Sequence, residues 1–222
     1  MRFLAALLAC TSACTGWSPQ SPQPSHKRTA VHATDAAWQD FWQDLAARPE
    51  IRDAWRRAPC VLKGIAPADA HTLDALTQAV DADPSTLDDA ARVAHGATQG
   101  WTNVALDADA RPSRRLRASS SKASVLLNHG GVAFPSLLGG ACRAALDAFE
   151  QPVGLNVYLT GDRVAKAAPP HTDRQEVFVV QCAGAKRWRV FAPPHPPLKP
   201  EADPFARGKG TDVLDERSLA CM

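Results

Sequence analysis

The sequence predicts an α+β protein in which helices come first and closely spaced strands follow. Two observations carry this prediction. Apolar residues recur at helical spacing between residues 34 and 150, whereas apolar and polar residues alternate between residues 153 and 191. Helices followed by strands in this order are typical of a chain that ends in a β-sandwich or a β-barrel.

The composition is that of an ordinary folded protein. The 222 residues include 25 basic and 23 acidic side chains, which gives a net charge of +2. This balance provides no overall electrostatic attraction to nucleic acid, so we expect no direct nucleic-acid binding. No apolar run approaches the roughly 20 residues that a membrane span needs, so we expect none. The six cysteines form no CxxC pair and match no common zinc spacing.

Residues 1–33 are expected to be a leader followed by a linker. A single arginine precedes an apolar stretch at residues 3–9, a pattern that resembles a secretory or organellar leader. An unstructured N-terminus is the alternative. Residues 18–25 are rich in proline, glutamine and serine and are expected to be a linker. The folded part is therefore expected to begin near Thr34.

The first helices are predicted between residues 34 and 57. Thr34 is a suitable N-cap, and four apolar residues follow it at helical spacing. Pro49 fits the first turn of a second helix, which we expect to run to Arg57. A short strand is expected at residues 60–62. The apolar stripe of the first helix consists of Trp38, Phe41, Trp42 and Leu45.

Three further helices and one loop are predicted before residue 150. Pro67 and Pro135 each begin a helix with one apolar face, and residues 84–94 are expected to form another helix. Residues 107–122 are basic and rich in serine. Because no aromatic side chains are interleaved for stacking on bases, this segment is interpreted as a solvated loop.

The strands are predicted at residues 156–160, 176–182 and 186–191. In the first, Asn156, Tyr158 and Thr160 share one face. Residues 183–185 form the turn between the second and third strands. In the third strand, alternation places Lys186 on the same face as Trp188.

Two residues of the segment between these strands suggest a metal site. In an extended segment His171 and Asp173 project from the same face, so they can reach one point. An imidazole and a carboxylate are two of the three ligands of the facial triad that binds Fe(II). The alternative is a surface histidine that happens to lie near a surface aspartate.

Lys186 is expected to point toward the same interior. A buried ammonium group needs an anionic partner, and the distal carboxylate of 2-oxoglutarate is a suitable one. The alternative is a lysine at the sheet edge that faces solvent.

Four motifs in this region resemble the core of one family. They are NVYLT at 156–160, PPHTD at 169–173, EVFVVQ at 176–181 and GAKRWRVF at 184–191. Their order and spacing are similar to those of JmjC-domain Fe(II)/2-oxoglutarate oxygenases of the ribosomal-oxygenase, or histidyl-hydroxylase, branch. The resemblance implies a double-stranded β-helix, which is a cupin-like or jelly-roll-like barrel, over residues 151–222, with helices over residues 34–150 leading into it.

The resemblance also implies a function and roles for particular residues. The family couples oxidation of 2-oxoglutarate on Fe(II) to hydroxylation of a C–H bond in a protein, such as a histidine of a ribosomal protein, and some members are described as histone lysine demethylases. The implied partner is a protein or peptide, the implied location is nuclear, nucleolar or cytoplasmic, and a homodimer is left open. The implied iron ligands are His171 and Asp173, and the implied 2-oxoglutarate site consists of Lys186, Asn156, Tyr158 and Thr160.

The third iron ligand of the family is a second histidine on a later strand. His195 is the sole histidine after His171, and it lies in a proline-rich segment that is expected to be a loop. We therefore expect a barrel that lacks its closing strands. Three interpretations follow: a fragment of an active oxygenase, a non-catalytic cupin-like binding module, or a metal site that is completed by oligomerisation.

Overall fold

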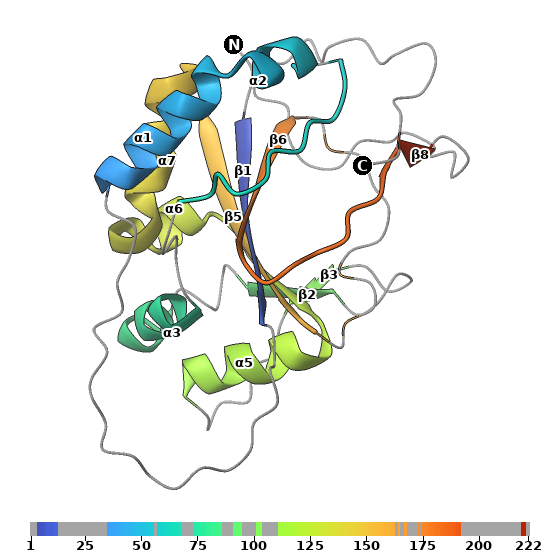
Figure 1. The fold of residues 1–222 in the computed structure, drawn as a ribbon. Helices are drawn as coiled ribbons and strands as arrows, with labels where there is room; N and C mark the ends of the chain where they lie inside the picture. Colours follow the sequence, from blue (N-terminus) through green and yellow to red (C-terminus); the bar gives the residue numbers. More distant parts are fainter. Residues whose placement is uncertain are drawn as a thin grey trace, which may run out of the picture.

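The fold is a mixed six-stranded sheet with helices packed against it (Figure 1). The structure is a computed structural model that describes residues 4–12, 35–55, 57–67, 73–85, 91–94, 101–103, 111–162, 164, 167, 173, 175–191 and 219–220. Helices and strands both contribute, as the predicted α+β class requires, but β1 precedes the helices and β2, β3 and β4 lie among them. The helices are α1 (Asp35–Ala47), α2 (Pro49–Ala54), α3 (Leu73–Ala82), α5 (Pro112–Lys122), α6 (Gly130–Ala133) and α7 (Pro135–Phe149). The strands are β1 (Leu4–Ser12), β2 (Ala91–Ala94), β3 (Trp101–Asn103), β4 (Ser124–Leu127), β5 (Val153–Gly161), β6 (Glu176–Ala183), β7 (Val190–Phe191) and β8 (Leu219–Ala220).

Strands β5 and β6 form where the sequence alternation predicts them. Leu155, Val157 and Leu159 of β5 are buried, because alternate side chains of a strand point to the same face. After β6 the chain turns at Gly184, whose φ of 67° is favourable for glycine because it has no Cβ. The third predicted strand is shorter than expected, since only Val190–Phe191 forms β7, which pairs with β8 in a separate two-stranded sheet.

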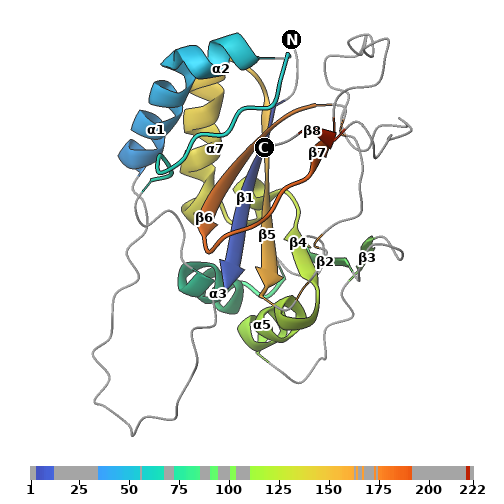
Figure 2. The ribbon, with the colours of Figure 1, turned by 45° about the vertical axis from the view of Figure 1, so that its right-hand side comes forward.

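The N-terminal segment differs from its prediction. Leu4–Ser12 forms β1, which lies between β5 and β6 and pairs in parallel with both (Figure 2). Its pairing begins at Leu4 with Val153 and runs to Ser12 with Gly161. The stretch is rich in leucine and alanine. Such a continuous apolar sequence is typical of a central strand with parallel neighbours, because strands of this kind are usually covered on both faces. The expectation that folded structure begins near Thr34 is therefore wrong for this segment.

The other side of β5 carries an antiparallel extension of the sheet. The strand order is β3-β2-β4-β5-β1-β6, and β4 pairs with β5 through Ser124 opposite Thr160. Residues 91–94 form β2 instead of the end of the helix predicted at 84–94, because β4 and β3 supply hydrogen-bonding partners on both its edges. The strand predicted at residues 60–62 is also wrong, since these residues have no regular structure.

Helices α1 and α7 pack side by side against one face of the sheet (Figure 1). The predicted stripe on α1 is confirmed as its buried face, and α2 and α7 begin at the prolines expected to begin them. Aromatic rings from α1, α7 and β6 meet there: Trp42 lies 4.9 Å from Phe41, 6.1 Å from Phe149 and 5.7 Å from Phe178 between ring centroids. This aromatic cluster is the centre of the core. Among the described residues, no helix is both long enough and apolar enough to cross a membrane.

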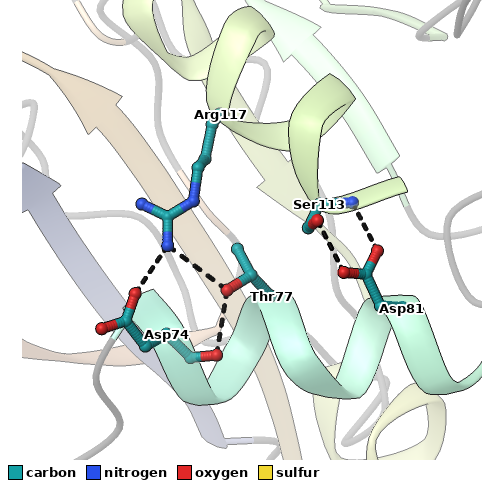
Figure 3. A network of polar contacts seen from close by, with 5 residues as sticks. All are labelled: Asp74, Thr77, Asp81, Ser113 and Arg117. Atoms are coloured by element: carbon teal, nitrogen blue, oxygen red, sulfur yellow. Dashed lines mark hydrogen bonds and ion pairs between the residues drawn. The ribbon is translucent and has the colours of Figure 1, made fainter. Parts of the chain in front are cut away.

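Helix α5 lies where the basic loop was predicted. Residues 112–122 are helical because Pro112 is favourable at the first turn and Leu116 is buried in the core. Polar contacts join α5 to α3: Arg117 donates to Asp74 at 2.6 Å, and Ser113 Oγ donates to Asp81 at 2.7 Å (Figure 3). The hydrogen bonds from Ser113 hold the pKa of Asp81 below its ordinary value. Arg117 and Ser113 of this segment thus link helix α5 to helix α3.

Candidate functional site

The polar face of β5 carries the first three candidate residues. Asn156, Tyr158 and Thr160 lie on the opposite face from the buried leucines and valine of the same strand. Asn156 and Tyr158 are half-buried, and Thr160 is buried. The alternation of β5 therefore brings the three predicted residues to one surface of the sheet.

Lys186 reaches this surface from the segment after β6. Its Nζ lies 3.2 Å from Thr160 Oγ1, to which it donates a hydrogen bond, and 5.9 Å from the centroid of the Tyr158 ring. The Trp188 ring lies 5.5 Å from the same nitrogen, so Lys186 and Trp188 lie beside each other as expected, although residues 185–189 form no strand. The alternative of a lysine at the sheet edge facing solvent is not what the geometry shows.

The ammonium group of Lys186 has no carboxylate partner among the described residues. The ammonium group contacts one hydroxyl and two aromatic rings, and burial lowers the pKa of Lys186 below its ordinary value. A half-buried ammonium group without a counter-ion attracts an anion, because the anion restores the stabilisation that burial removes. The geometry fits a carboxylate bound by Lys186 with the Thr160 hydroxyl beside it.

Tyr158 is held as a neutral hydrogen-bond donor. Burial raises the pKa of Tyr158 to about 12, the negative charge of Asp173 adds to the rise, and a hydrogen bond from Asn156 opposes it. The phenol therefore keeps its proton throughout the neutral range.

Asn156 is oriented by a strained residue that sequence reasoning missed. The backbone N–H of His129 donates to Asn156 Oδ1 at 3.1 Å. His129 has a φ of 54°, a left-handed conformation that costs about 1 kcal/mol or more outside glycine. A Cβ at the next residue, Gly130, would lie 2.8 Å from the end of the Leu138 side chain and 3.0 Å from the end of the Leu155 side chain, so both leucines would have to shift. This turn fixes the amide of Asn156, which can then donate to Tyr158.

One of the two predicted metal ligands, Asp173, is among the described residues. His171 and His195 lie outside the described residues, whereas Asp173 is described and is exposed. Among the described residues, no group of three or more His, Cys, Asp or Glu side chains could hold a metal ion. The donor types at 171 and 173 suit Fe(II), and their role as ligands stays a prediction.

Comparison with protein families identifies the class of this region. Residues 141–217 match the JmjC domain family, and this stretch contains β5, β6 and β7 together with the C-terminal part of α7. A cupin-like fold is the fold that a JmjC domain implies.

The similar curated proteins belong to one branch of that family. The bifunctional lysine-specific demethylase and histidyl-hydroxylase NO66 of Drosophila mojavensis is 46% identical over 75 residues, which are 34% of this chain and 8% of the relative. Ribosomal oxygenase 2 of Rattus norvegicus is 46% identical over 48 residues, which are 22% of this chain and 10% of the relative. The chain thus spans about a tenth of the length of these relatives, and no solved structure matches it. The resemblance to the ribosomal-oxygenase branch of the JmjC proteins is confirmed over this region.

Proposed function

We propose that this chain acts as an Fe(II)- and 2-oxoglutarate-dependent dioxygenase on a protein substrate. The observation that carries the proposal is the half-buried ammonium group of Lys186, which has a hydroxyl beside it and no carboxylate partner among the described residues. A dicarboxylic acid with one carboxylate at Lys186 supplies that partner, and the JmjC match over residues 141–217 favours 2-oxoglutarate as the acid.

Each residue of the site has a separate role in binding this co-substrate. Lys186 neutralises the distal carboxylate, and the hydroxyl of Thr160 and the ring of Tyr158 lie beside its ammonium group and hold it in place. Asn156 orients Tyr158. His171 and Asp173 would hold the iron. When bound, iron and 2-oxoglutarate together supply the oxidising chemistry, and the protein supplies position and a site shielded from water.

The described activities of the relatives support a proposal for the substrate class. These relatives are described as a histidyl-hydroxylase and lysine-specific demethylase, and as a ribosomal oxygenase. We infer that this chain takes a histidyl side chain of a ribosomal protein or a methylated lysine of a histone. Both are protein side chains, and in this proposal they approach the polar face of β5, where Lys186 and Thr160 lie.

The deciding experiment measures turnover of 2-oxoglutarate. The purified chain is incubated with Fe(II), oxygen and ribosomal-protein or histone peptides, and succinate is measured by NMR. We expect succinate that depends on both iron and peptide, and we expect His171→Ala or Asp173→Ala to abolish both turnover and Fe(II) binding. The matched control is Asp147→Asn, which changes an exposed carboxylate on α7 and should leave both unchanged.

Two outcomes of this experiment would contradict the proposal. Binding of 2-oxoglutarate without succinate formation in the presence of iron would favour a non-catalytic cupin-like binding module. Unchanged Fe(II) affinity in both ligand variants would remove His171 and Asp173 from the metal site.

The affinity for 2-oxoglutarate is expected to fall at alkaline pH. The carboxylate binds the protonated form of Lys186, and burial lowers the pKa of this residue. Binding should therefore be strongest below the lowered pKa and should be lost as the pH rises through it, earlier than for an ordinary lysine. Isothermal titration at a series of pH values tests this. Lys186→Arg should retain affinity for 2-oxoglutarate throughout the accessible pH range, since the guanidinium group stays charged there. If this variant loses affinity at the same alkaline pH as the natural chain, deprotonation of Lys186 is not the cause of the loss.

A further inference from the structure

A buried serine on β4 is joined to the candidate site by hydrogen bonds. Ser124 is 0% exposed, and it lies among the buried apolar residues Ala123 and Val125. Burial of a hydroxyl group is unfavourable unless a hydrogen bond compensates for it. The partner is Thr160, whose Oγ1 lies 2.6 Å from Ser124 Oγ across the paired strands β4 and β5.

Thr160 connects Ser124 to Lys186. The Lys186 ammonium can only donate, so Thr160 Oγ1 accepts its hydrogen bond at 3.2 Å and uses one lone pair to do so. Ser124 then takes either the second lone pair or the hydroxyl hydrogen of Thr160. In either arrangement the Thr160 hydroxyl is no longer free to rotate, because two of its hydrogen-bonding positions are fixed.

We propose that Ser124 is a positioning residue for the distal carboxylate of the co-substrate. It fixes the hydroxyl of Thr160, and Thr160 in turn holds the ammonium group of Lys186 at the point where the carboxylate binds. This inference rests on the proposed function and adds to it a residue that does not contact the co-substrate. The same contact explains why a serine occupies a fully buried position in the otherwise apolar strand β4.

The proposal predicts that loss of Ser124 weakens binding of the distal carboxylate of the co-substrate and not binding of its 2-oxo acid group. Pyruvate carries the 2-oxo acid group of 2-oxoglutarate but has no distal carboxylate. Loss of Ser124 should therefore weaken 2-oxoglutarate binding and leave pyruvate binding unchanged, whereas a general loosening of the fold would weaken both. The ratio of the two affinities separates positioning from a purely structural role.

The test is a double-mutant cycle on Ser124 and Thr160, measured by isothermal titration with 2-oxoglutarate and with pyruvate in the presence of Mn(II). Ser124→Ala should lower the ratio of affinities about fivefold and Thr160→Val about tenfold, in keeping with the loss of a neutral and of a charge-assisted hydrogen bond. The double variant should lose no more than Thr160→Val alone, because Ser124 acts through Thr160. In steady-state assays the KM for 2-oxoglutarate should rise and kcat should stay constant.

Two further variants complete the design. Thr77→Val removes another buried hydroxyl, on α3 and away from the site, and should leave the ratio unchanged. If Ser124→Ala does not fold, Ser124→Cys tests the same hydrogen bond with a side chain of similar size, and the same fall in the ratio is expected.

The outcomes are distinguishable. An unchanged ratio in the Ser124 variant, or losses that add in the double variant, would overturn the role of Ser124 and leave the proposed function standing. A wild-type chain that does not prefer 2-oxoglutarate to pyruvate would overturn the proposed function, and with it this inference.

Discussion

Lys186→Met is expected to lower the affinity for 2-oxoglutarate roughly a hundredfold. The substitution removes the charge that neutralises the distal carboxylate and retains an apolar side chain of similar length beside the Tyr158 and Trp188 rings. Because burial disfavours the charged form of Lys186, we expect the variant to fold at least as stably as the natural chain. Isothermal titration and thermal unfolding measure the two quantities separately.

Arg187→Met is the matched control for this substitution. It also removes one positive charge, from the adjacent residue, which is exposed. A surface charge has little effect on a site that it does not face, so the affinity for 2-oxoglutarate should change less than about twofold. Equal losses in the two variants would show that net charge, and not a specific lysine, attracts the co-substrate.

Trp42→Ala is expected to have the largest effect on stability, about 3–5 kcal/mol in the free energy of unfolding. The Trp42 side chain is 1% exposed, and its ring contacts those of Phe149 on α7 and Phe178 on β6. Truncation leaves a cavity at the point where two helices meet the sheet. Denaturant unfolding monitored by circular dichroism measures the loss.

Two other variants show whether burial is the cause. Trp42→Phe retains most of the ring contacts, and it removes an indole N–H that has no hydrogen-bond partner among the described residues, so it should cost much less than Trp42→Ala. Trp188→Ala removes an equally large ring that is 41% exposed and should change stability by less than about 1 kcal/mol. A Trp42→Ala variant as stable as Trp188→Ala would mean that the aromatic cluster is not the centre of the core.

The parts of the fold that the sequence predicts are those with a clear local period. Strand β5 alternates without interruption and helix α1 repeats its apolar residues at helical spacing, so both were expected where they occur. Helix α5 was expected to be a loop because its sequence is mostly serine and arginine and contains one large apolar residue, Leu116, which is too few to show a helical period. Its contacts with α3 stabilise a helix that local propensity only weakly favours.

In the candidate site, too, the residues predicted from the sequence are those with a local pattern, and the residues missed depend on distant contacts. Asn156, Tyr158 and Thr160 were expected to share a face because β5 alternates, and Lys186 was expected to point to the interior, where it donates to Thr160. Ser124 and His129 reach the site through pairing between β4 and β5 and through a left-handed turn, both of which depend on distant contacts. The signal that could have identified Ser124 is a single serine at the start of the apolar run SVLL.

The central position of β1 affects the order in which the chain can fold. Leu4 pairs with Val153 and with Glu176, so the middle of the sheet joins segments about 150 residues or more apart. Bringing such distant segments together has a large entropic cost and makes folding slow. During synthesis at about 5–20 residues per second, the first strand would wait roughly 10–30 s for its neighbours on both sides. Throughout that interval β1 is an apolar strand with both edges unpaired, which exposes it to aggregation until its neighbours are made.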